Sequence, residues 1–126
     1  MELTTVSALA FVVVTLAAIG FQLALAAGAP WGAYAMGGRV AGRFPPPLRV
    51  AAVVQAVVLA LLAAVVMARA GLWTPSVAPW LIWVVVAFSG LSLAMNAASR
   101  SPGERRLWVP VATVMLATSL VVALAG

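Results

Sequence analysis

The chain has 126 residues, of which 66% are hydrophobic and only 7% are charged, with a formal net charge of +5. Soluble domains carry roughly 25% charged residues, so this composition excludes an ordinary water-soluble domain. There is no cysteine and no histidine, and the acids are Glu2 and Glu104 alone. Thiol, histidine and paired-carboxylate catalysis and the usual metal sites are therefore excluded, and we expect no enzyme activity, metal or cofactor.

Apolar runs of about 20 residues predict membrane-spanning helices. The first run is 6–27, and we expect it to be retained rather than cleaved as a signal peptide, because it is long and no basic residue precedes it. The connection that follows, residues 28–47, is rich in glycine and proline. Its middle is apolar, so we expect it to lie in the membrane interface or to turn back into the protein. Tyr34 in this middle is the only phenol of the chain and suits an interfacial anchor.

Three further spans are predicted, over 48–68, 79–96 and 107–125. A turn rich in glycine and proline, 71–79, joins the second span to the third, and the most polar segment of the chain, 97–106, joins the third to the fourth. Within that segment we expect Glu104 to pair with Arg100 or Arg105. The sequence thus predicts an all-α polytopic membrane protein, a single four-transmembrane-helix bundle.

Arginine placement predicts the topology. All basic residues are arginines, and every one except Arg69 lies in the segments after the first and third spans or, as Arg49 does, at the adjoining start of the second span. The positive-inside rule then places both of these segments in the cytoplasm and both termini outside, in the cell (plasma) membrane. The arginines also predict contact with anionic lipid headgroups and not with nucleic acid, because they sit in short loops beside spans rather than on a folded basic face. The six arginines of the predicted cytoplasmic side are Arg39, Arg43, Arg49, Arg100, Arg105 and Arg106.

Small residues recur every four positions on the first two spans, a spacing that lets helices approach closely in lipid. Such stripes serve either the packing of helices within the bundle or the packing against a second copy or a partner membrane protein. The positions are Gly20, Ala24, Gly28, Ala52, Ala56 and Ala60.

Each span carries one uncharged polar side chain at nearly the same depth, roughly 6–10 Å below the predicted cytoplasmic boundary by the helical rise. These are Gln22, Gln55, Asn96 and Thr113. One interpretation is that they hold the bundle together by hydrogen bonds between helices. The other is a ligand site open to the cytoplasm, in which the amides hold a polar group and Arg39, Arg43, Arg100 or Arg105 holds an anion.

Two functions follow from these interpretations. The first is a non-enzymatic binding, accessory or scaffold component whose loops touch lipid headgroups or a membrane partner. The second is a small transporter or channel for a polar or anionic solute. Convergence of the four polar side chains on a cavity would favour a ligand site, whereas a closed and dry interior would favour the structural role.

A further pattern of the sequence consists of residues 28–34, Gly37-Gly38, Gly42-Arg43, 47–49, 96–100, Glu104-Arg105 and 108–110. In these residues the chain resembles a group of small uncharacterised bacterial membrane proteins with four predicted spans, common in actinobacteria. The resemblance implies the four-span architecture in a bacterial inner membrane and no particular activity. Related sequences have a histidine in the first loop, and this chain has none.

Overall fold

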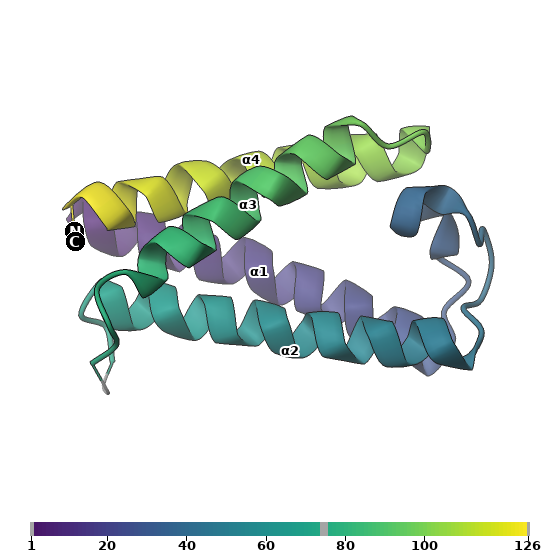
Figure 1. Cartoon of the computed structure of the whole chain (residues 1–126), viewed down its shortest axis with the longest axis horizontal. Coiled ribbons are helices and arrows are strands. Elements are labelled where there is room, and N and C mark those ends of the chain that lie inside the picture. Colours follow the sequence, from purple (N-terminus) through teal and green to yellow (C-terminus); the bar gives the residue numbers. More distant parts are fainter. Residues whose placement is uncertain (1, 74–75, 126) are drawn as a thin grey trace.

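The computed structural model describes residues 2–73 and 76–125, and in these ranges it is all-α, as predicted. Thr74 and Pro75, in the predicted turn 71–79, lie outside the described residues. Two short 3₁₀ turns, η1 (Gly32–Tyr34) and η2 (Met36–Gly38), follow the first helix (Figure 1). The long helices are α1 (Leu3–Ala27), α2 (Pro46–Arg69), α3 (Leu81–Ala97) and α4 (Pro102–Ala125).

Three of these helices are long and apolar enough to cross a membrane: α1 with 25 residues, and α2 and α4 with 24 each. The fourth, α3, is apolar but has 17 residues. At the rise of an α-helix its length is about 26 Å, a little less than a hydrocarbon core of about 30 Å. The architecture fits a membrane bundle of three long helices and one shorter one.

The helices form a bundle whose two ends differ (Figure 1). Both chain termini lie at one end, which we call the termini end, and residues 28–45 and 98–101 lie at the other, the loop end. Helix α1 packs along α2 and α4, and α3 packs along α4. Helices α2 and α3 have few contacts, and they separate toward the loop end.

The separation of α2 and α3 divides the packed interior. The larger core includes Phe11, Val66, Val85 and Val122, one side chain from each long helix, all fully buried. A second, smaller core at the loop end contains Leu25, Phe44 and other apolar side chains and fixes the first loop to α1 and α2. Space is left between the two cores on the side of α3.

Local backbone chemistry sets the ends of the helices that frame this space. Gly28 ends α1 in a left-handed conformation (φ 103°), and its N–H donates to the carbonyl of Leu25. This is the common glycine C-cap. Helix α4 begins at Pro102, so residues 102–106 are helical although the sequence predicted a loop as far as residue 106. The physical reason is a capping sequence, Ser101-Pro102-Gly103-Glu104, in which the Ser101 Oγ accepts the Glu104 N–H at 3.2 Å.

Candidate ligand-binding site

A cavity of about 810 Å³ opens between the helices at the loop end. Its walls come from all four long helices and from the first loop. Most of the wall is apolar, and Leu59, Phe88 and Met115 are examples. A volume of this size lies within the range of roughly 300–1,000 Å³ that is usual for small-molecule sites.

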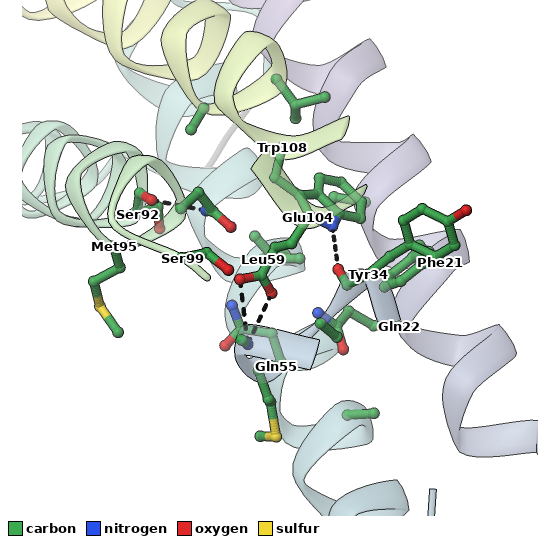
Figure 2. A pocket seen from close by; sticks show the side chains of 18 of the residues that line it. Phe21, Gln22, Tyr34, Gln55, Leu59, Ser92, Met95, Ser99, Glu104 and Trp108 are labelled. Carbon is green, nitrogen blue, oxygen red and sulfur yellow. Dashed lines mark hydrogen bonds between the residues drawn. The ribbon is translucent and has the colours of Figure 1, made fainter. Parts of the chain in front are cut away.

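Residues 32–38, which we call the loop cap, cover one side of the cavity and are held by the start of α4. Three sets of hydrogen bonds join them. The Ser101 hydroxyl donates to the Ala33 carbonyl at 2.6 Å. The Trp108 Nε1–H donates to the Tyr34 carbonyl at 2.7 Å. The Gly37 N–H donates to both carboxylate oxygens of Glu104, at 3.2 and 3.3 Å (Figure 2). The segments 28–47 and 97–106, predicted to lie on the same side of the membrane, are therefore in direct contact.

Three of the four side chains in the predicted polar layer line this cavity: Gln22, Gln55 and Asn96. All three are half-buried. The Asn96 Nδ2 donates to the Ser92 carbonyl at 2.7 Å, which leaves its side-chain oxygen as an acceptor. The interior at this depth is thus hollow rather than packed shut.

Thr113 does not join this layer. Its side chain is exposed on α4, and its hydroxyl donates to the Val109 carbonyl at 2.7 Å. A threonine on a transmembrane helix satisfies its hydroxyl in this way without any partner helix. Thr113 therefore does not converge on the cavity with the other three side chains.

The arginines do not form one anion-binding cluster. Arg39 lines the cavity, and its side chain is exposed. Arg105 donates to the Ser99 carbonyl, and Arg49 donates through Nε to the Phe44 carbonyl at 2.7 Å. Both bonds fasten the loops, and each uses one nitrogen of its guanidinium group. Arg43 and Arg100 are exposed and are absent from the cavity wall.

Glu104 is the residue that the sequence placed wrongly. It was expected to pair with Arg100 or Arg105 in a loop. Instead it lies in the first turn of α4 with 6% of its surface exposed, lines the cavity and accepts the Gly37 N–H. The capping sequence of residues 101–104 was the available signal, because serine followed three residues later by glutamate marks a helix start. Read in this way, the sequence places Glu104 in the first turn of α4 and not in a solvated loop.

Aromatic rings close the cavity on the side of α1. Phe21 packs edge to face against Trp108, with ring centroids 4.8 Å apart. It also stacks with Trp31 of the first loop at 6.1 Å. Phe21, Trp108 and Tyr34 line the cavity (Figure 2). Tyr34, predicted as an interfacial anchor, is 42% exposed at the rim.

The site combines an apolar and aromatic wall with three amides, one carboxylate and one arginine at the edge. Residues 2–73 and 76–125 contain no group of three or more histidine, cysteine or acidic side chains that would hold a metal ion. The carboxylate stands in the wall without a paired acid, because Glu2, the other acid of the sequence, is the N-cap of α1 and does not line the cavity.

Comparison with known proteins gives the chain no relative from which a function would follow. No family model, no curated protein and no solved structure matches it. The resemblance to small four-span bacterial membrane proteins therefore stays a prediction.

Proposed function

We propose that this protein is a non-enzymatic membrane component that binds a small amphipathic molecule in the cavity at the loop end. The observation that carries the proposal is the cavity of about 810 Å³ with Gln22, Gln55 and Asn96 in its wall. Polar groups inside a membrane bundle are costly unless they are paired or serve a ligand or water. An apolar hollow with a few convergent polar groups is the usual form of a small-molecule site.

We further propose that the four α-helices span the plasma membrane and that the loop end lies in the cytoplasm. This topology is supported by the arginine distribution, since six of the seven arginines lie within residues 39–49 and 100–106, in or beside the two segments that meet at the loop end. Exposed arginines at this end, such as Arg43 and Arg100, suit contact with anionic lipid headgroups. Each would contribute about 1 kcal/mol of attraction to such a surface.

A transporter is the second candidate, and the same cavity supports it as an inward-facing half-site. The fully buried core at Phe11, Val66 and Val122 fills the bundle toward the termini end. A continuous channel through one copy of the chain is thus disfavoured. Transport would require this core to open, whereas simple binding would not.

Topology is tested by cysteine labelling, for which a chain without native cysteines is well suited. Gly42→Cys and Leu72→Cys introduce single thiols at exposed positions of the first and second connections. In spheroplasts we expect a membrane-impermeant maleimide to label Leu72→Cys alone, and to label both variants after permeabilisation. Labelling of Gly42→Cys in intact spheroplasts would reverse the proposed orientation.

Binding is tested by filling the cavity. Ser92 lines it from α3 and is half-buried, so Ser92→Phe should occupy much of the space. Ala94→Phe is the matched control, because Ala94 lies on the same helix, is exposed and is absent from the cavity wall. We expect native mass spectrometry of gently extracted protein to show a retained small molecule in the wild type and in Ala94→Phe and to show none in Ser92→Phe. Retention in all three proteins would place the bound molecule elsewhere.

A further inference from the structure

Glu104 differs from every other charged residue that the structure describes, since it is the one that is buried. Its carboxylate lies in the cavity wall, where Gln22 and Gln55 also turn their side chains inward (Figure 2). Burying a charge is costly unless hydrogen bonds or an opposite charge compensate it. A compensating charge is thus what this position most lacks.

The bonds to Glu104 leave part of its accepting capacity open. An ionised carboxylate has about four lone-pair sites on its two oxygens. One backbone N–H, that of Gly37, is shared between the two oxygens at 3.2 and 3.3 Å. The arginines expected to pair with it are used elsewhere or exposed: Arg105 donates to the Ser99 carbonyl, and Arg100 is exposed. A ligand group that donates hydrogen bonds would find free acceptors here.

Arg39 also lines the cavity, and its charge has the opposite sign. The two charges do not cancel, because their surroundings differ. Arg39 is exposed, and water and salt screen its charge. Glu104 is 6% exposed and lies beside apolar and aromatic side chains, where a charge acts more strongly. The cavity interior is therefore governed by the carboxylate.

The rest of the cavity wall also suits a ligand with a positive charge. Aromatic side chains of Phe21, Phe88 and Trp108 line the cavity, and the faces of such rings attract cations. The side-chain oxygen of Asn96 is free, because its nitrogen already donates to the Ser92 carbonyl. Acceptor oxygens, aromatic rings and an apolar body together match a molecule with a positive nitrogen or phosphorus centre and apolar substituents.

We infer that the ligand of this cavity is an amphipathic organic cation, with its charge held at Glu104 and its apolar part between α2 and α3. This inference rests on the proposed binding function and replaces the anionic solute expected from the arginines. An anion of the same size would meet the buried carboxylate and be disfavoured.

Two probes of nearly identical shape and opposite charge test the inference: tetraphenylphosphonium and tetraphenylborate. Saturable binding of each to the full chain in a nonionic detergent is measured by native mass spectrometry. We expect tetraphenylphosphonium to bind about tenfold more tightly or better, because its positive charge is attracted by the buried Glu104 carboxylate, whereas the negative charge of tetraphenylborate is repelled. Glu104→Gln should remove this preference, while Glu2→Gln, the same change at the exposed acid, should keep it.

A second variant guards against a general loss of structure in Glu104→Gln. Glutamine keeps one acceptor oxygen for the Gly37 N–H, so the contact with the loop cap has a replacement. Adding Gln55→Glu to Glu104→Gln returns a carboxylate to the wall of the same cavity, now on α2 instead of α4. Recovery of the cation preference in the double variant is the expected result.

The outcomes separate the ligand class from the binding function. Equal binding of both ions in the wild type, with loss of both in Ser92→Phe, would overturn the inferred preference for a cation and leave the cavity as a binding site. Tighter binding of tetraphenylborate would show that the cavity prefers an anionic ligand. Absence of saturable binding for either ion, together with unchanged adducts in Ser92→Phe, would overturn the binding function as well.

Discussion

Gly32→Ala is expected to lower the free energy of unfolding by about 3 kcal/mol or more, as a severe case of overpacking. Gly32 is buried at the start of η1, and a Cβ there would lie 1.8 Å from the Val40 carbonyl oxygen and 2.7 Å from that of Gly42. Both clashing atoms belong to the backbone, so a change of side-chain rotamer does not relieve the clash. The Gly32 N–H also donates to the Gly42 carbonyl at 3.0 Å, and any shift that relieves the clash would break this bond.

The control is Gly42→Ala, on the other side of the same hydrogen bond. A Cβ at Gly42 would meet nothing within 4 Å. We expect its effect to stay within about 0.5 kcal/mol, as for most exposed substitutions. Thermal unfolding in a nonionic detergent, followed by circular dichroism, compares the two variants. Equal melting temperatures would show that the first loop does not pack as described.

Phe11→Ala is expected to cost about 3 kcal/mol of unfolding free energy. The Phe11 side chain is fully buried in the larger core, with Val66 and Val122 in the same cluster. The cost should fall at the low end of the range for Phe→Ala, because unfolded transmembrane helices stay in lipid and only the packing term is lost.

Leu16→Ala on the same helix is the control for Phe11→Ala. Leu16 is 58% exposed on α1, where lipid or detergent replaces the contacts that its side chain gives up. We expect a change within about 0.5 kcal/mol. Denaturation of both variants by increasing fractions of sodium dodecyl sulfate in mixed micelles measures the difference. A larger loss for Leu16→Ala than for Phe11→Ala would mean that α1 presents a different face to the bundle.

Hydropathy predicts the all-α class well, because a run of about 20 apolar residues has few stable alternatives to a helix in a membrane. It predicts helix ends less well. The apolar run of the last helix begins near Leu107, but its capping sequence starts the helix at Pro102. Hydropathy reports the immersed part of a helix, whereas capping decides where the backbone bonds begin. Glu104 lies in residues 102–106, which are helical but precede the apolar run. Its place in the cavity wall was therefore missed.

The direction in which polar side chains point was only partly predictable. In a soluble protein the inward face of a helix is marked by apolar periodicity. In a membrane helix all faces are apolar. The sequence therefore shows how deep in the membrane a side chain lies, but not whether it points into the bundle or toward lipid. Depth correctly grouped Gln22, Gln55 and Asn96, and it wrongly added Thr113, whose hydroxyl is satisfied by its own helix. The hydrogen bonds of Arg49 and Arg105 were not predictable either, because the carbonyl groups that accept them come near these side chains only in the folded loops.

The bonds of the loop cap also bear on the order in which the chain is assembled. The partners of its three fastening contacts are 67, 68 and 74 residues apart in sequence. Helices α1 and α2 are synthesised and able to pair before Ser101, Glu104 or Trp108 exists. The cavity wall is therefore completed only after α4 is made, and a nascent chain that ends before α4 holds its amides without its carboxylate. Maturation of the site would coincide with insertion of α4.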